Sequence, residues 1–172
     1  MKYSLGQLQN DFRKGVQPKY LFFWGHRPTK DGSVSQSCLS QWWMAPFKVE
    51  GSTFASAEHW MMHQKALLFS DGEMAAAILE AKSSAQAKKL GRKVKDFSPE
   101  VWEAHKYQIV VAGNHHKFSQ HPELQTFLVN TKTACWSRPA QWIEFGGLGW
   151  QKIIPILKTP CYGKEKTYWG LP

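Results

Sequence analysis

The stretch that most constrains the fold begins at Ser98-Pro99-Glu100 and runs to residue 118. Serine is a common N-cap, proline fits the first helical position, and an acidic side chain interacts favourably with the positive end of a helix. The pattern therefore predicts a helix over residues 99–118. Its expected buried stripe consists of Val101, His105, Gln108, Ile109 and Ala112, broadened by Trp102 and Val110.

Further helices are expected before and after this one. Ser56 is a predicted N-cap whose hydroxyl would accept a hydrogen bond from the first turn, and no Gly or Pro follows before residue 70. This predicts a helix over residues 57–69. Helix-forming residues also dominate EMAAAILEAK (73–82), SAQAKKLGRKV (84–94) and ELQTFLVN (123–130).

Strand signals are confined to the first third of the chain. Residues 20–25 (YLFFWG) form an aromatic run that fits a short strand. Phe47, Val49 and Phe54 flank Glu50-Gly51, a dipeptide that suits a tight hairpin turn. The expected fold class is α+β and predominantly helical, as one compact domain with a small β-hairpin near the N-terminus.

The composition indicates a cytosolic protein with an excess of basic residues. The first residues lack the apolar segment of a secretory signal, and no apolar run approaches the ~20 residues of a membrane span, so we expect a cytoplasmic, non-membrane protein. Cys38, Cys135 and Cys161 are odd in number and lack C-x-x-C spacing, which predicts free thiols. The net charge of +9 would attract free or polymeric phosphates. Nothing in the sequence predicts an oligomeric state.

The helix expected over residues 57–69 carries the strongest candidate site. Glu58, Met61, Met62 and Lys65 share one face, which puts an acid and an amine ~10 Å apart along the axis, enough for a substrate between them. A Lys near apolar neighbours could act as a nucleophile. The alternative is commonplace, because a Glu in a first turn and a solvated Lys are ordinary features of helices.

Other candidate groups have equally plain alternatives. His59 and His63 are spaced i, i+4 but lack the Glu of H-E-x-x-H, so no metal site is expected. Without a nucleotide-binding glycine loop, no cofactor is expected either. The cations Lys88, Lys89, Arg92 and Lys93 could bind a phosphate or form a solvated helix face. The rings of Phe23, Trp24, Trp42 and Trp102 could stack on a base or belong to the core.

Several motifs follow one another over residues 20–131: FFWG, S-Q-W-W-M-A-P-F, F-x-S-A-E-H-W-M-M-x-Q-K-A, K-K-L-G-R-K-V, a Trp opening the next helix, and K-F-x-Q-H-P-E-L. Together and in this order they resemble the motifs of the NADAR superfamily, which includes the YbiA-like N-glycosidases. The resemblance implies a compact, mostly helical domain. It also implies hydrolysis of the ribosyl C–N bond in ribosylaminopyrimidine 5'-phosphates, intermediates of the riboflavin pathway.

The resemblance also implies roles for particular residues. Glu58 and Lys65 stand at the family's functional Glu and Lys, and Trp102 is the favoured stacking ring. We expect Glu58 to transfer a proton and Lys65 to attack the anomeric carbon. Phe23, Trp24, Lys89 and Arg92 complete the expected substrate-binding set. The partner would be a small phosphorylated ribosyl compound.

One alternative function is removal of ADP-ribose from modified nucleobases or nucleotides, with nucleic acid only as the modified substrate. Another is a basic nucleic-acid-binding module.

Past Lys132 the likeness ends, so we expect a NADAR-like domain over residues 1–132 and a divergent tail over 133–172. Family members continue with a stretch like L-V-E-A-S-P-x-D-x-x-W-G-x-G-L, where this chain reads TKTACWSRPAQWIEFGGLGW. Back-translated codons of the tail, read from their third positions, are compatible with LVEASPVDRIWGIGLA, and Trp142-Ile143 forces the Asp codon. Our interpretation is a frameshift near Lys132, which would remove the family's site Asp and could leave the chain inactive.

Overall fold

The computed structural model describes residues 10, 13–16, 19–132 and 135–137, and the chain divides into two compact units. Residues 25–130 form the larger unit, and residues 1–24 group with residues 131–172. This division differs from the boundary expected at residue 132, because the first 24 residues join the C-terminal part.

The smaller unit contains a two-stranded parallel sheet. Strand β1 (Tyr20–Phe22) pairs with β4 (Cys135–Ser137), and Leu21 lies opposite Trp136. β1 confirms the strand expected in this region but ends before Phe23. β4 was not expected from the sequence. Cys161 lies outside the described residues, and Cys38, in the larger unit, is a free thiol.

The larger unit begins with a short 3₁₀ helix and the expected hairpin. Helix η1 (Gln36–Leu39) precedes β2 (Met44–Val49), which pairs antiparallel with β3 (Ser52–Ser56). Glu50 and Gly51 connect the strands with positive φ angles of 47° and 82°. Two positive values are the requirement of a type I′ turn, which matches the strand twist. The predicted hairpin is therefore confirmed.

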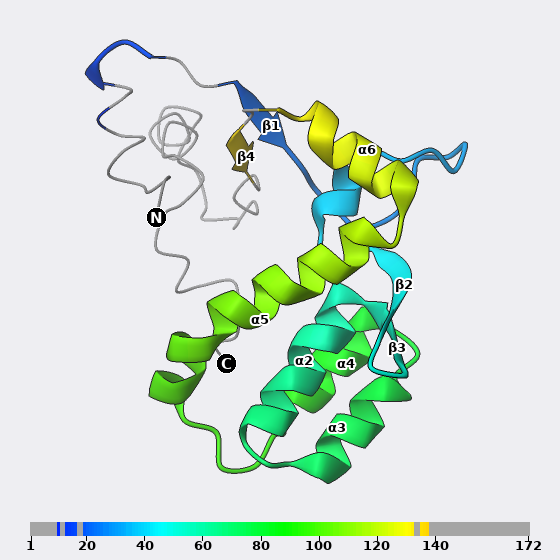
Figure 1. Cartoon of the computed structure of the whole chain (residues 1–172), viewed down its shortest axis with the longest axis vertical. Helices are drawn as coiled ribbons and strands as arrows, with labels where there is room; N and C mark the ends of the chain where they lie inside the picture. The colour runs from blue at the N-terminus through cyan, green and yellow to red at the C-terminus, as the bar shows by residue number, and fades with distance from the viewer. Residues whose placement is uncertain (1–9, 11–12, 17–18, 133–134, 138–172) are drawn as a thin grey trace, which may run out of the picture. The chain divides into compact units, whose positions relative to one another are not determined.

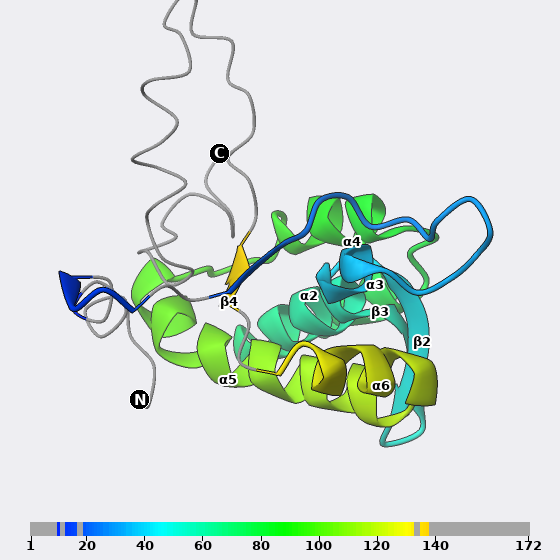
Figure 2. The same ribbon diagram turned by 90° about the horizontal axis from the view of Figure 1, so that it is seen from above.

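The expected helices are all present with small shifts at their ends. They are α2 (Ala57–Leu68), α3 (Gly72–Leu79), α4 (Ser84–Gly91), α5 (Pro99–Ser119) and α6 (Pro122–Asn130). Helix α2 packs against α3, α4 and α5, and α6 packs against α5, as the views in Figures 1 and 2 both show. α2 is thus the central helix of this unit. Among the described residues, no helix combines the length and the apolar character needed to cross a bilayer.

Helix α5 buries only part of the stripe expected, with Ile109, Val110 and Ala112 partly buried. Trp102, Gly113, Lys117 and Phe118 are buried, whereas Val101 is 40% exposed and His105 is exposed. Gly113 was not part of the expected stripe, but it lets α5 approach α2 closely. A Cβ placed there would overlap the indole of Trp60, whose Nε1 donates to the Ile109 carbonyl at 2.9 Å. The close approach of the α5 backbone to α2 at Gly113 therefore determines which face of α5 is buried.

The core of the larger unit lies between the hairpin and α2. Phe47, Phe54 and Trp60 pack together, and Phe54 meets Trp60 edge-on at 5.1 Å between ring centroids. Ile109 and Ala112 of α5 cover this cluster. Because the chain runs from β3 directly into α2, the hairpin core fixes the start of the helix that carries Glu58 and Lys65.

Candidate active site on helix α2

Glu58 lies in the first turn of α2 and is fully enclosed by the protein, with 1% of its surface exposed. Its backbone N–H donates to the Gln41 carbonyl at 3.0 Å. The S-Q-W-W segment is thereby held against the start of α2. A buried carboxyl in a closed environment can exchange a proton with a bound reactant without competition from bulk water.

A buried hydrogen-bond network fixes this first turn. The Ser56 hydroxyl contacts His59 Nδ1 at 2.8 Å and the Ser84 hydroxyl at 2.9 Å, and His59 Nε2 contacts the Ala81 carbonyl at 3.0 Å. Burial lowers the pKa of His59, so its ring is neutral and Nε2–H donates to Ala81. Ser56 is the N-cap residue, but the expected side-chain bond from a first-turn N–H is absent, and its hydroxyl instead donates to His59 Nδ1 and contacts Ser84.

Lys65 lies two turns further along α2 and is half-buried. Its Nζ donates to the Gly91 carbonyl at 2.8 Å. The same atom lies 3.9 Å from the centroid of the Phe97 ring and 5.8 Å from that of Trp102. Burial lowers the pKa of Lys65 below its ordinary 10.5. A lowered pKa increases the neutral fraction, which is the nucleophilic form of an amine.

The other expected site residues lie in three different settings. Trp102 lies beside Lys65 and is only 6% exposed. Its ring therefore faces the Lys65 amine and is not an exposed surface for stacking a base. Lys89 near the end of α4 and Arg92 at its C-cap are exposed. Phe23 and Trp24 belong to the smaller unit, where Trp24 is 53% exposed.

A second aromatic setting lies near the start of α2. The Trp42 ring is half-buried, with Lys88 Nζ 5.8 Å from a ring centroid and the His26 ring at 5.4 Å. The Ser84 hydroxyl contacts the Trp42 carbonyl at 3.3 Å. Trp42 is therefore tied to the network that fixes the turn bearing Glu58.

Phe97 is a site residue that sequence reasoning missed. It stands at N′ of α5, before the N-cap Ser98, and Trp102 stands at N4. An apolar pair at N′ and N4 is a hydrophobic staple, which places the two side chains near one another. The segment F-S-P-E-V-W contains this signal, and it could have marked the two rings that contact Lys65.

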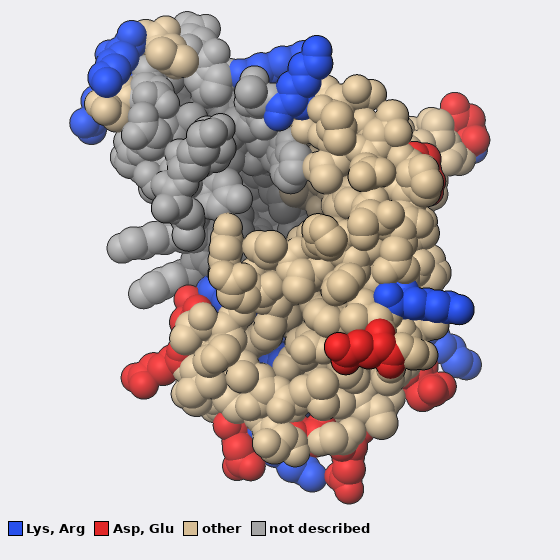
Figure 3. Space-filling model, viewed as in Figure 1, with Lys and Arg blue, Asp and Glu red and all other residues tan. Residues whose placement is uncertain are grey.

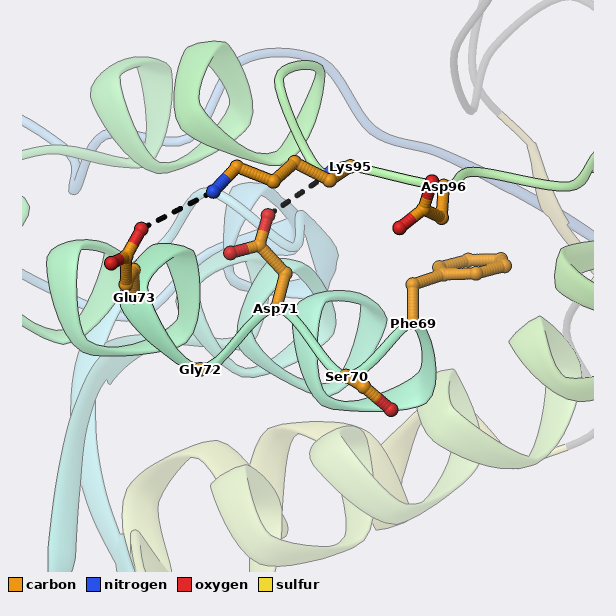
Figure 4. Close-up of a pocket in the computed structure, with 7 residues that line it drawn as sticks. All are labelled: Phe69, Ser70, Asp71, Gly72, Glu73, Lys95 and Asp96. Atoms are coloured by element: carbon orange, nitrogen blue, oxygen red, sulfur yellow. Dashed lines mark hydrogen bonds and ion pairs between the residues drawn. The ribbon is translucent and has the colours of Figure 1, made fainter.

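The segment that carries Phe97 is anchored at a hollow between the ends of α2 and α4 (Figure 4). Buried Asp71 caps α3 by accepting from Met74 N at 3.1 Å, and its other oxygen accepts from Lys95 N at 3.0 Å. The bond from Lys95 N, with that from Met74 N, lowers the pKa of Asp71. Lys95 Nζ also pairs with Glu73 at 3.2 Å. Asp71 thus fixes the chain two residues before Phe97.

Buried Lys117 forms a separate structural contact. Its Nζ donates to the carbonyls of Cys38 and Ser40 at 2.6 and 2.9 Å. Burial lowers the pKa of Lys117 to about 8, and burial raises the pKa of Cys38 to about 11. The amine caps η1 and stabilises the segment that leads to Gln41.

The part of the chain that the structure describes contains no cluster of three His, Cys, Asp or Glu residues able to hold a metal ion.

Comparison with known proteins places this site in a family. A model of the NADAR domain matches residues 22–142. The chain is 39% identical over 154 residues to the N-glycosidase R617 of Acanthamoeba polyphaga mimivirus, covering 86% of this chain and 89% of that protein. The chain belongs to the NADAR family. This NADAR protein is also 33% identical over 106 residues to the N-glycosidase YbiA of Escherichia coli (strain K12), covering 62% of each.

A solved structure agrees with this assignment. The NMR structure of the E. coli protein YbiA matches with a TM-score of 0.59 and 27% identity, covering 72% of this chain and 68% of that chain. The expected fold class, a mostly helical α+β NADAR domain with a small hairpin, is confirmed.

Proposed function

We propose that this NADAR protein is an N-glycosidase that hydrolyses the ribosyl C–N bond of ribosylaminopyrimidine 5'-phosphates. The observation that carries the proposal is the arrangement on α2, where an enclosed carboxyl lies two turns before an amine of lowered pKa. The relatives named N-glycosidase support cleavage of this kind of bond. The ribosylaminopyrimidine is the substrate that the motif resemblance implies.

The chemistry divides between the two side chains. Neutral Lys65 attacks C1′ of the ribose and forms a C–N bond, while the bond from C1′ to the pyrimidine amine breaks. The C1′–O4′ bond then opens as a proton moves from the lysine nitrogen to the ring oxygen, which leaves a Schiff base that borohydride can reduce. Glu58 transfers the proton that the departing amine needs. Water then attacks C1′, the bond to Lys65 breaks, and ribose 5-phosphate and the free amine are the products. Over the whole reaction, the water oxygen and one hydrogen go to C1′ of the ribose, and the other hydrogen goes to the free amine.

The remaining expected residues have binding roles in this proposal. Exposed Lys89 and Arg92 bind the 5'-phosphate, since a doubly charged anion is attracted by neighbouring cations. Trp102 orients Lys65. The surface seen in Figure 3 has scattered charges and no continuous basic patch over α5, so this face does not favour a nucleic-acid-binding module.

Substitution of Glu58 by Gln is the first test. Turnover of a ribosylaminopyrimidine 5'-phosphate should fall by ~10²–10⁴, the usual contribution of a positioned acid or base. Glu100→Gln is the matched control, because Glu100 also lies in a first helical turn but is exposed, and it should retain full activity. Near-normal turnover in Glu58→Gln would refute the role of this carboxyl.

Borohydride trapping tests the role of Lys65 and the choice of substrate. Reduction during turnover should leave a sugar adduct on Lys65 that peptide mass spectrometry locates, and Lys65→Arg should leave none.

Parallel reactions with ADP-ribosylated guanosine test the competing substrate class. Cleavage of that compound alone would overturn the assignment to ribosylaminopyrimidines.

A further inference from the structure

We propose that Phe97 is a positioning residue for the Lys65 amine, whose ring covers Nζ and separates it from water while a sugar carbon is attacked. This inference rests on the proposed function for its catalytic meaning. The contact itself is independent of that function, because it joins two side chains of the same unit.

The geometry around Nζ encloses the amine with groups from three segments. Helix α4 supplies the Gly91 carbonyl at 2.8 Å, the segment before α5 supplies the Phe97 ring at 3.9 Å, and α5 supplies the Trp102 ring at 5.8 Å. One neutral acceptor and two rings face the amine. Burial alone lowers the pKa of Lys65, with no contribution from a charged side chain.

Phe97 occupies the outer position in this enclosure. Its side chain is 41% exposed, whereas Trp102 is 6% exposed. The Phe97 ring is thus both 3.9 Å from the amine and partly in contact with solvent. Phe69 meets it edge-on at 5.3 Å between centroids and supports it from the end of α2.

The backbone that carries Phe97 is fixed immediately before it. Buried Asp71 accepts from Lys95 N, and Asp96 adopts a φ of 51°, a left-handed conformation that few non-glycine residues occupy. Ser98 then caps α5 by accepting from Val101 N. An unfavourable φ between two anchored residues indicates that the surrounding contacts fix the direction of the Phe97 side chain.

The ring has two opposing effects on the amine. Its π face attracts the ammonium form, which raises the pKa, and its bulk excludes water, which lowers the pKa. Burial lowers the pKa of Lys65, and the Phe97 ring, 3.9 Å from Nζ, is one of the groups that bury it. Removal of the ring should therefore raise the pKa, and each unit of increase reduces the neutral amine ~10-fold near neutral pH.

The experiment measures the amine directly in the full chain. Wild type, Phe97→Ala and Phe97→Leu are acetylated with acetic anhydride across a pH series, and mass spectrometry follows Lys65. The midpoint of the pH curve reports the pKa, whereas the final extent of labelling reports access. Tyr107→Ala is the control, since it removes an exposed ring of α5 that makes no contact with Lys65.

We expect the Phe97→Ala midpoint to move to higher pH, with the borohydride-trapped adduct at neutral pH falling several-fold. Phe97→Leu should stay near wild type, because leucine also excludes water. Identical midpoints for wild type and Phe97→Ala would overturn the proposal, as would a downward shift. A shifted midpoint in a protein that cleaves none of the substrates would support the cover by Phe97 and refute the proposed glycosidase function, whereas cleavage without a trapped adduct would refute only the covalent role of Lys65.

Discussion

At the residue scale, Lys117 and Cys38 make the free energy of unfolding depend on pH. Lys117 has a pKa of about 8 when folded and 10.5 ordinarily, so between these values the unfolded chain binds more protons and stability rises with pH. Cys38 has a pKa of about 11 when folded and 9.0 ordinarily, so its contribution is complete below pH 9 and is lost as pH rises toward 11. The two effects oppose each other between pH 9 and 10.5.

Substitution of either residue should separate these effects. In urea unfolding between pH 9 and 10.5, Cys38→Ala should gain stability with pH more steeply than wild type, because only the Lys117 effect remains. Lys117→Met should lose stability with pH over the same range. Lys48→Met, at an exposed strand position, is the control and should follow wild type. Equal slopes in all four proteins would contradict the assigned pKa shifts.

The site could be predicted in part from single residues. Helical spacing placed Glu58 and Lys65 on one face because that relation depends only on the helix repeat. The same reasoning missed the bond from Lys65 to the Gly91 carbonyl, since a backbone acceptor carries no side-chain signal. It also expected the Ser56 hydroxyl to accept from a first-turn N–H, whereas the hydroxyl contacts His59 in the same turn and Ser84 of a distant helix.

At the element scale, two glycines set how closely the helices approach α2. A Cβ on Gly113 of α5 would overlap Trp60, and a Cβ on Gly91 of α4 would overlap the side chain of Met62. The stiff indole cannot move aside, whereas the thioether chain can change rotamer. α5 is therefore the neighbour of α2 that tolerates least change.

Gly113→Ala should test this close approach. We expect a loss of ~1–3 kcal/mol in unfolding free energy, the usual cost of forcing extra volume into a packed interior. The matched control is Gly72→Ala at the start of α3, where no atom lies within 4 Å of the added Cβ. That change should be neutral or stabilise by ~0.4–1 kcal/mol in chemical denaturation. A Gly113→Ala protein as stable as its Gly72→Ala counterpart would show that α2 and α5 can separate without cost.

The elements themselves were largely predictable because their signals are local. Ser98-Pro99 marked the start of α5 and Glu50-Gly51 marked the hairpin, and both features depend on neighbouring residues alone. The buried face of α5 and strand β4 were not predictable in the same way. The first depends on Gly113 meeting Trp60, and the second depends on pairing between residues more than a hundred positions apart.

At the scale of the whole molecule, the two units differ in how their sequence relates to the family. The larger unit, residues 25–130, lies entirely within the NADAR match, which covers residues 22–142. Residues 143–172 lie outside that match. The candidate acid and amine, with the groups that surround the amine, all belong to the larger unit. The NADAR match also runs ten residues past Lys132, where the likeness was expected to end.

The reading-frame interpretation predicts what the coding DNA will show. Sequencing around the codon for Lys132 should reveal a one-nucleotide slip, and a chain with the frame restored should continue with LVEASPVDRIWGIGLA from about Cys135. Because that segment returns an Asp which the present tail lacks, the restored chain should cleave ribosylaminopyrimidine 5'-phosphates faster and unfold at higher urea. A chain ending at Lys132 is the control, and it should be no more active than the present one. An uninterrupted frame, with an intact mass of 19.7 kDa for the natural protein, would refute the slip.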